Sequence, residues 1–330
     1  MKILQIVADG KVGGGTTFVL DLMQDTPGCT LITQSNSYAQ KQTDGIGLDF
    51  FTSRFDPRIP YHLYQTIKKQ GPDLIHVHGG RAAFFLSFCP KVCPIIYTCH
   101  GLHGIYQKSL LGEWGQKWAM RRSDLVTFVS HSEETLAIKL NLMGRTPHCV
   151  IPNGVNLNKL PKRKKPKPKL LGFIGRLVYQ KDPLFLLKVM DLLGPQGYHL
   201  KVVGGGPYEK EMQTHPNVTL LGTLPQKEAL ASLTDVEALL MPSRWEALPL
   251  VMLEAMGMEI PIIASHIPPF EEVLKHGTLI KERDPQLYAN AVLNLNDQST
   301  KAKKDLIENY SWEKCRNAYH AIFREFNRNS

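Results

Sequence analysis

Apolar residues recur along the chain in two alternating patterns. In the first 155 residues, six short runs rich in Ile, Leu and Val predict β-strands, and five segments with apolar residues at helical spacing lie between them. Alternation of this kind is typical of a parallel sheet with helices on both faces. The expected strands are residues 3–8, 30–34, 74–78, 95–99, 125–130 and 148–151, and the expected helices are 16–23, 60–70, 81–88, 112–123 and 133–142.

The same alternation returns after residue 169 and predicts a second unit of the same class. A last stretch, residues 311–326, has apolar residues near helical spacing and predicts an amphipathic helix. The fold class is therefore α/β, with two Rossmann-like, doubly wound domains, although no tandem sequence repeat is visible. The expected strands are 170–174, 199–203, 218–221, 238–241 and 261–264, and the expected helices are 183–193, 227–233, 250–257 and 286–295.

A proline- and lysine-rich segment separates the two halves. The sequence PKRKKPKPK at residues 161–169 carries six basic residues. Prolines and like-charge repulsion favour an extended, solvated linker. We therefore expect four parts, which are a Rossmann-like domain over 1–155, a linker over 156–169, a second Rossmann-like domain over 170–310 and a C-terminal helix over 311–330.

Composition narrows the class of protein. The chain has 330 residues, of which 43% are hydrophobic and 21% charged, as in ordinary globular proteins. No apolar run approaches the roughly 18 residues of a membrane-spanning helix, and the first apolar run is too short for a signal peptide. The six cysteines follow no disulfide framework, so we expect reduced thiols and a cytoplasmic location.

Charge is spread unevenly. Residues 1–160 carry 16 Lys and Arg against 11 Asp and Glu, whereas residues 170–330 carry 17 against 19. A basic first half followed by a basic linker indicates an anionic surface near that half, such as the inner face of a membrane. The linker is equally compatible with a plain solvated spacer.

Glycine-rich loops follow the first strand of each half. Gly13, Gly14 and Gly15 come between the first strand and the next helix, where backbone N–H groups can point at an anion. The loop has neither dinucleotide-fingerprint nor P-loop spacing, so a simple flexible turn is the alternative. In the second half, Arg176 follows a strand and Lys181 precedes a helix, so both cations could converge on a diphosphate.

The stretch 242–265 carries two glutamates, Glu246 and Glu254, between two predicted strands. We expect Glu246 in a loop at the carboxyl end of a strand and Glu254 about two turns into the following helix. Two carboxylates beside a helix N-terminus could bind hydroxyl groups while the helix end holds phosphate. This combination of groups suits a nucleotide sugar.

Several histidines and cysteines lie close together in the sequence between residues 76 and 103, which suggests zinc. The spacing argues against a metal site, because no C-x-x-C pair occurs and Cys93 and Cys99 flank a predicted buried strand. Packing cysteines are the expected alternative. We also expect the run Phe84–Phe88 to form a buried helix rather than a lipid-inserting one.

Taken in order, these pieces resemble the retaining glycosyltransferases of family 4, also called group 1, which have the two-Rossmann-domain GT-B fold. The resemblance covers nearly the whole chain, and the set is more specific than any one piece. The matching segments are GGG (13–15), HVHGGRAAFF (76–85), YTCHG (97–101), VIPNGVN (150–156), GRLVYQKD (175–182), VGGGP (203–207) and EALPLVMLEAMG (246–257).

The resemblance implies roles for individual residues. Glu246 would contact the donor sugar, Glu254 the ribose, Arg176 and Lys181 the diphosphate, and His100 the reacting centre. The catalytic candidates are thus His100, Glu246, Arg176 and Lys181. The donor-binding candidates are Gly14, Gly15, Gly175, Gly205, Pro207, Leu248, Leu250, Val251 and Glu254, and the acceptor-side candidates are His78 and Arg81.

The resemblance also implies a fold and an activity. The two domains would face a cleft, and the C-terminal helix would cross back to the first domain. The expected enzyme is a retaining, metal-independent hexosyltransferase without a cofactor. Its donor would be a nucleoside-diphosphate sugar, with UDP favoured, and its acceptor a glycan or lipid-linked intermediate of surface polysaccharide, lipopolysaccharide or glycolipid synthesis. We expect peripheral contact with an anionic membrane surface through the basic first domain and linker.

Two departures from the family pattern and two other functions stay open. Ala247 stands where many members have Gly and could narrow the sugar pocket, and Asn156 stands where many have Asp. A nucleotide-sugar 2-epimerase of GT-B fold would also need a histidine and acids. A basic, non-catalytic nucleic-acid-binding protein is disfavoured, because the charge lies in a Pro-rich linker and no nucleic-acid partner is expected.

Overall fold

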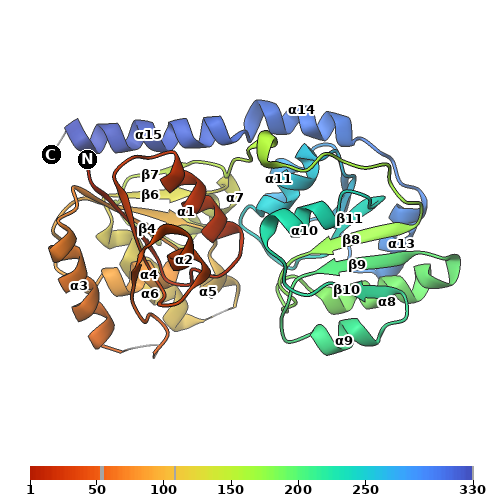
Figure 1. Ribbon diagram of the computed structural model, residues 1–330, viewed down its shortest axis with the longest axis horizontal. Coiled ribbons are helices and arrows are strands. Elements are labelled where there is room, and N and C mark those ends of the chain that lie inside the picture. Colours follow the sequence, from red (N-terminus) through yellow and green to blue (C-terminus); the bar gives the residue numbers. More distant parts are fainter. Residues whose placement is uncertain (53–55, 108, 329–330) are drawn as a thin grey trace. The chain divides into compact units, whose positions relative to one another are not determined.

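The computed structural model describes residues 1–52, 56–107 and 109–328. The chain divides into two compact units, and the division is discontinuous in sequence. Unit 1 comprises Met1–Asn153 together with Glu313–Ser330, and unit 2 comprises Gly154–Trp312. Each unit is a parallel sheet covered by helices (Figure 1), so the predicted α/β class and the two Rossmann-like units are confirmed.

Unit 1 contains a seven-stranded sheet in the order β3-β2-β1-β4-β5-β6-β7. All residues of its central strands β1, β4 and β5 are buried, which explains their mostly apolar sequences. The buried polar exceptions are Gln5, His76, His78 and Thr98. The strand order reverses between β1 and β4, so the crevice for a ligand would lie beyond their carboxyl ends. The strands are β1 Ile3–Val7, β2 Cys29–Thr33, β3 Ile46–Gly47, β4 Leu74–His78, β5 Ile95–Cys99, β6 Leu125–Phe128 and β7 His148–Val150.

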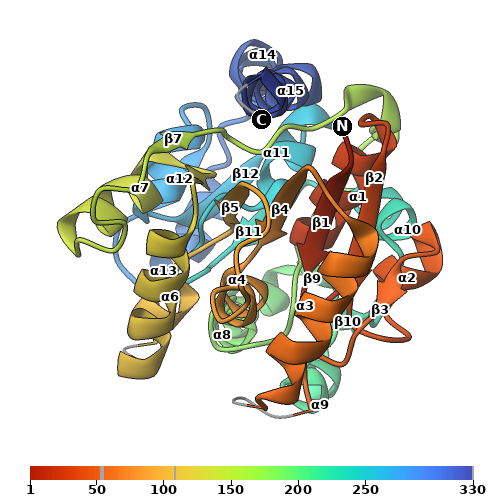
Figure 2. The ribbon, with the colours of Figure 1, turned by 90° about the vertical axis from the view of Figure 1, so that its left-hand side faces the viewer.

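The helices of unit 1 connect these strands on both faces of the sheet. Figure 2 shows α4 between α3 and α6. The helices are α1 Gly14–Gln24, α2 Tyr38–Thr43, α3 Arg58–Gln70, α4 Gly80–Leu86, α5 His103–Tyr106, α6 Leu110–Arg122 and α7 His131–Lys139. The short α2 and α5 and the two-residue β3 were not expected, because segments this short lack a readable periodicity.

Unit 2 repeats the arrangement with six parallel strands in the order β10-β9-β8-β11-β12-β13. Its order reverses between β8 and β11. The strands are β8 Leu170–Ile174, β9 His199–Val203, β10 Val218–Leu220, β11 Ala238–Met241, β12 Ile262–Ser265 and β13 Thr278–Ile280. The helices are α8 Pro183–Leu193, α9 Glu209–Thr214, α10 Gln226–Ser232, α11 Leu250–Gly257, α12 Pro268–Val273, α13 Pro285–Leu293 and α14 Ser299–Asn309.

The C-terminal helix α15, Trp312–Arg328, packs on unit 1 along residues 313–328. The hydroxyl of the fully buried Tyr319 lies 3.2 Å from Oγ1 of Thr98 and 3.3 Å from Oγ1 of Thr127. His320 Nε2 lies 2.9 Å from Oγ1 of Thr26. The helix is therefore part of the core of unit 1, although almost 160 residues separate it from the rest of that unit.

Five of the six basic residues of the linker are exposed, as its composition suggested, but the linker also makes specific contacts within unit 2. The backbone N–H groups of Lys164 and Lys167 donate to the carbonyls of Thr234 (2.9 Å) and Asp235 (2.8 Å). The Lys167 ammonium also forms an ion pair with Asp235 at 2.9 Å, and Arg163 donates to the carbonyl of Glu259. Backbone pairing and opposite charges in unit 2 thus offset the repulsion among the lysines.

Candidate functional site

In unit 2, the predicted donor residues gather at the topological switch point. The loop 175–182 follows β8 and the loop 242–249 follows β11, and these two strands are neighbours in the sheet. Parallel strands place both loops at the same edge, where open α/β sheets bind their ligands. The sequence motifs thus become one site in space.

An ion pair forms the centre of this site. Nζ of Lys181 lies 2.5 Å from Oε1 of Glu246, and the two side chains are only 13% and 7% exposed. Gln180 Nε2 donates to Oε2 of Glu246 (3.3 Å) and to the carbonyl of Trp245 (3.0 Å). The amide oxygen of Gln180 accepts from Arg176 at 3.1 Å. Gln180 therefore links Arg176 to the predicted sugar-binding carboxylate, which Lys181 contacts directly.

Asp182 fixes the far end of the same loop. Its buried carboxylate accepts from Arg244 (2.8 Å) and from Arg283. Its backbone has φ +48°, a left-handed conformation that costs energy for a residue other than glycine. Arg244 also lies over the ring of Tyr179, at 4.1 Å from its centroid. The two arginines thus hold Lys181 in place through the adjoining residue.

Two glycines allow the loops after β8 and β9 to touch. Gly204 (φ +137°) and Gly206 (φ +152°) lie so close to the carbonyl oxygens of Gly175 and Leu177 that a Cβ atom would overlap them. The N–H of Leu177 donates to the carbonyl of Gly205 at 2.8 Å. The glycine run after β9 therefore allows close contact with the backbone on either side of Arg176. The sequence alone did not specify this positioning role.

Glu254 lies on α11, and its position corrects the sequence prediction. The helix begins at Leu250, so Glu254 is about one turn into it rather than two, because Pro249 still has extended backbone. The carboxylate is 6% exposed and accepts from Nε2 of Gln226 at 2.5 Å. Within the described residues no side chain caps the first turn of α11 and no acid lies in it. The positive end of the helix dipole at this turn is therefore not offset by an acidic side chain of the turn itself.

The other donor candidates of unit 2 flank these groups. Leu248 is buried before α11, and Leu250 and Val251 are half-buried in its first turn. Gly175 begins the loop after β8, and Gly205 and exposed Pro207 lie in the loop after β9. Sequence reasoning missed Gln180, Asp182, Gln226 and Arg244. Gln180 and Asp182 lie inside the matched segment 175–182, and this position was the available signal.

In unit 1, the candidates gather at its own switch point. Gly14 and Gly15 form the first turn of α1 after β1, His78 ends β4 and His100 follows β5. The ring of Phe18, one turn further along α1, packs against His78 and His100 at centroid distances of 6.0 and 5.2 Å. Both histidines are thus placed by the sheet and by α1.

A hydrogen-bond chain sets the proton positions on these histidines. The amide oxygen of Gln5 lies 2.7 Å from Nε2 of His78, so Nε2 carries the proton and donates. Nδ1 of His78 then accepts from Nε2 of His100 at 3.1 Å. This chain leaves Nδ1 of His100 as an acceptor, suited to a hydroxyl group.

Burial keeps these rings neutral. It lowers the pKa of His100 to about 4, with a smaller contribution from the charge of His103. It lowers the pKa of His76 to about 3 and that of His78 well below its ordinary value. His100 is therefore a neutral imidazole at physiological pH, and an acceptor rather than a cation.

Arg81 lies on α4 and faces a different partner from the histidines. Its Nε donates to the carbonyl of Phe50 at 2.9 Å, and its guanidinium lies 4.4 Å from the centroid of the Phe51 ring. The guanidinium also lies 5.6 Å from the centroid of the Phe85 ring, and none of these three contacts involves His78.

The cysteines are free thiols. Cys99 is buried in β5, and burial raises its pKa to about 12, so it is protonated and contributes to packing. Among the described residues, no group of three or more His, Cys, Asp or Glu side chains is placed to hold a metal ion. Across the same part of the chain, no helix combines the length and the apolar character needed to cross a membrane.

Comparison with known proteins decides the family. The model described as "Glycosyl transferases group 1" matches residues 156–311, and the one described as "Glycosyltransferase Family 4" matches residues 31–159. The chain belongs to the group 1, family 4 glycosyltransferases. The matches overlap at residues 156–159 and include the site of unit 2 together with His78 and His100 of unit 1, whereas Gly14 and Gly15 lie before the matched residues.

Similar proteins have related names. One relative is the UDP-Gal:alpha-D-GlcNAc-diphosphoundecaprenol alpha-1,3-galactosyltransferase of Escherichia coli, which is 26% identical to this chain over an alignment of 290 residues. The alignment covers 77% of this chain and 72% of the Escherichia coli protein. Anabaena HepE in complex with UDP and glucose has a TM-score of 0.84 at 18% identity, covering 98% of this chain and 99% of that one. Sucrose-phosphate synthase from Thermosynechococcus elongatus has a TM-score of 0.83 at 16% identity, covering 100% of both chains. The GT-B fold class is confirmed.

The buried histidines predict acid lability of the glycosyltransferase. His76 and His100 stay neutral in the folded state, whereas in the unfolded chain they bind protons below about pH 6.5. Stability should therefore be full above pH 6.5 and fall as the pH drops toward the native pKa values of about 4 and 3. In this range the free energy of unfolding should fall by about 1.4 kcal/mol per pH unit for each such histidine.

Urea titrations between pH 4 and 7.5 measure this slope. His76→Gln should reduce it, and His131→Gln, at a side chain that is 72% exposed, is the matched control and should leave it unchanged. A free energy of unfolding that stays constant from pH 6.5 to 4 would show that these rings are protonated in the folded protein.

Proposed function

We propose that the protein is a retaining, metal-independent hexosyltransferase that uses a nucleoside-diphosphate sugar, with UDP favoured. Its acceptor is a glycan or lipid-linked intermediate in cell-surface polysaccharide, lipopolysaccharide or glycolipid synthesis. It would work in the cytoplasm, peripheral to the inner face of the membrane. The observation that carries the proposal is the Lys181–Glu246–Gln180–Arg176 constellation at the switch point of unit 2.

The signs of charge in this constellation match the parts of such a donor. Arg176 and Lys181 are cations suited to phosphate oxygens, and the first turn of α11 adds positive N–H groups. Glu246 and Glu254 are carboxylates suited to hydroxyl groups. These acids are eight positions apart in sequence, so one can bind the sugar and the other the ribose. Cations near one end and acids at two places suit a nucleoside diphosphate with a sugar attached.

In the proposed reaction the bond between the anomeric carbon and the diphosphate oxygen breaks while the acceptor oxygen bonds to the same carbon. The acceptor proton passes to the departing diphosphate oxygen, as front-face substitution requires. Negative charge grows on the diphosphate as it leaves, and Arg176, Lys181 and the α11 N-terminus stabilise that charge. The neutral His100 offers an acceptor nitrogen for a hydroxyl on the substrate side.

The related proteins support the substrate classes. The Escherichia coli relative is named for a UDP-sugar donor and a diphosphoundecaprenol acceptor. The HepE structure contains UDP and glucose. A panel of UDP-, GDP- and ADP-sugars, read by thermal shift and donor hydrolysis, tests the base and the sugar. NMR of the anomeric proton of the product tests retention.

Activity is expected to survive EDTA, because protein cations and backbone dipoles meet the diphosphate charge in this proposal. The measurement is the initial rate with and without chelator, with a Mn²⁺ and Mg²⁺ add-back. Loss of activity that either ion restores would defeat the metal-independent part of the proposal.

The 2-epimerase alternative makes a different demand on the donor. It would convert or hydrolyse the nucleotide sugar with no acceptor present. NMR of the donor incubated alone with enzyme separates the two reactions, since a transferase leaves most donor intact until an acceptor is added.

A further inference from the structure

Helix α6 of unit 1 has large apolar side chains on the face that points to solvent. Leu110 is 84% exposed, Leu111 56%, Trp114 49% and Trp118 41%. Phe88, which follows α4, is 48% exposed, and its ring lies tilted beside that of Trp118 with centroids 6.4 Å apart. We call these five residues the α6 surface.

The arrangement is a continuous face rather than scattered residues. Positions 110, 114 and 118 are spaced four apart, and 111 lies beside them, so all four share one side of the helix. The opposite side packs into unit 1 through Gly115, Ala119 and Met120, which are buried. Trp114 and Trp118 stack at 6.1 Å with an angle of 16° between their planes. Single exposed apolar residues are normal, but an apolar patch of this kind marks an interaction site.

Basic residues border the α6 surface at the C-terminal end of the helix. Lys117, Arg121 and Arg122 lie on α6 itself, against one acid, Glu113. Arg121 donates to the carbonyls of Asn141 (3.0 Å) and Leu142 (3.3 Å). Arg122 donates to that of Cys89 (3.2 Å). In the described part of the chain neither guanidinium pairs with a carboxylate, so both keep a net positive charge.

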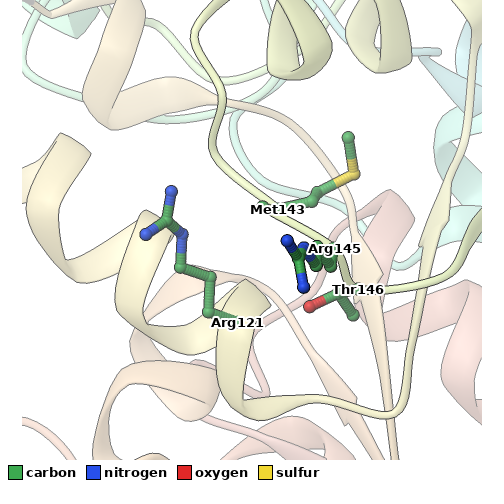
Figure 3. A pocket seen from close by; sticks show the side chains of 5 residues that line it. Arg121, Met143, Arg145 and Thr146 are labelled. Atoms are coloured by element: carbon green, nitrogen blue, oxygen red, sulfur yellow. The ribbon is translucent and has the colours of Figure 1, made fainter.

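An open hollow of about 460 Å³ adjoins this end of the helix, lined by Arg121, Met143, Gly144, Arg145 and Thr146. Figure 3 shows Arg121 extending from its helix, with Met143, Arg145 and Thr146 on the loop across from it. Gly144 has φ +63°, and a Cβ there would lie 3.3 Å from Nε of Arg121. The loop therefore fits closely over Arg121 and brings a second arginine to the rim.

Indole rings, leucines and adjacent arginines on one helix face match the chemistry of a lipid interface. Trp and Leu enter the boundary between headgroups and acyl chains, and Lys and Arg attract anionic headgroups. We propose that the α6 surface docks on an anionic lipid bilayer, with headgroup phosphates at Arg121 and Arg145. The inference rests on the proposed function and deepens it, because a lipid-linked acceptor is presented at such a surface.

The structure favours α6 over the linker as this contact. Arg163 and Lys167 of the linker bind a carbonyl and a carboxylate of unit 2, and Lys169 donates to the carbonyl of Gln196 at 2.8 Å. Of the large apolar side chains that are exposed in the described part of the chain, none belongs to the linker. Charge alone gives attraction, whereas the α6 surface adds apolar insertion.

Vesicle flotation tests the proposal. Wild-type protein should float with phosphatidylcholine vesicles containing phosphatidylglycerol, and less with pure phosphatidylcholine. Trp114→Ser/Trp118→Ser should lower the partition coefficient roughly tenfold or more. Arg121→Gln/Arg145→Gln should reduce the preference for anionic lipid and its salt sensitivity. Tyr61→Ser/Ile307→Ser, at residues 61% and 47% exposed on other helices, is the matched control and should partition like wild type.

Two further measurements distinguish a loss of membrane binding from misfolding of the serine variant. Circular dichroism should show the same melting for wild type and the serine variant, and lipids brominated in the acyl chain should quench tryptophan fluorescence in the wild type. Turnover of a water-soluble acceptor should be unchanged in the serine variant, so failure of docking and failure of the glycosyltransferase proposal are distinguishable.

Several outcomes would overturn the docking proposal. They are unchanged flotation of a folded serine variant, loss of flotation on neutralising the linker lysines instead, and concentration-dependent dimerisation abolished by the serine substitutions. The last result would make the α6 surface a contact between proteins.

Discussion

Replacing Lys181 by methionine is expected to lower kcat/KM roughly 100-fold or more, equivalent to about 2.7 kcal/mol. The ammonium lies at the switch point of unit 2 beside Glu246, where charge would develop on a departing diphosphate. Arg176→Ala should cost a similar factor. Both variants should lose more rate than ground-state nucleotide affinity, because the diphosphate charge grows toward the transition state. Initial rates and calorimetry with a nucleoside diphosphate measure the two effects.

The ion pair makes a control necessary for Lys181. Removing the lysine leaves the buried Glu246 without its opposite charge, which alone destabilises a protein by several kcal/mol. A double-mutant cycle with Glu246→Gln separates the roles. If Lys181→Met has no further effect in the Glu246→Gln background, the lysine serves only to neutralise the carboxylate. Full activity in both the Arg176 and Lys181 variants would mean that unit 2 holds no diphosphate.

Substitutions of the two glutamates are expected to have different effects on nucleotide binding and on sugar transfer. Glu254→Ala should weaken binding of the free nucleoside diphosphate about 10- to 100-fold, because charge-assisted hydrogen bonds worth about 1.5–3 kcal/mol are lost. Glu246→Ala should leave that binding nearly intact and reduce transfer, since its assigned partner is the sugar. Calorimetry on both variants and their transfer rates decide the assignment.

Gln226 provides the matched control for Glu254. It donates to that carboxylate at 2.5 Å without being a proposed ligand contact. Gln226→Leu should therefore weaken nucleotide binding less than Glu254→Ala does. Equal losses of nucleotide affinity in the Glu246 and Glu254 variants would show that the assigned roles are wrong.

The sequence predicted most of the long elements because burial dictates their composition. Strands β4, β5, β8, β9 and β11 occur at the predicted residues, since central parallel strands are largely buried and mostly apolar. The eleven-residue α14 was missed, because only Ser299, Ala302 and Leu306 are buried in it. Short helices such as α2, α9 and α12 span one or two turns, and too few residues remain in them to show a period.

Only those residues of the candidate site that belong to recognisable sequence motifs were predicted. Residues 176, 181, 246 and 254 were identified because the motif and the chemistry agreed. Gln180 and Asp182 were not, because their roles depend on contacts with Trp245 and Arg283, distant in sequence. The contacts of the linker were not predicted for the same reason, since its partners Asp235 and Glu259 lie far from it in sequence. Long-range pairing leaves no local pattern.

The discontinuity of unit 1 has a consequence for how the chain is made. Residues 154–312 form one uninterrupted unit, whereas the other unit needs its final helix, whose Tyr319 and Phe323 fill the space over Thr98 and His76. On the ribosome, chains fold domain by domain as they emerge. Here the later-synthesised unit is complete first, and the earlier one waits, with part of its interior open, until α15 has been synthesised. A premature stop just before residue 313 would therefore damage the unit that is synthesised first and spare the unit formed by residues 154–312.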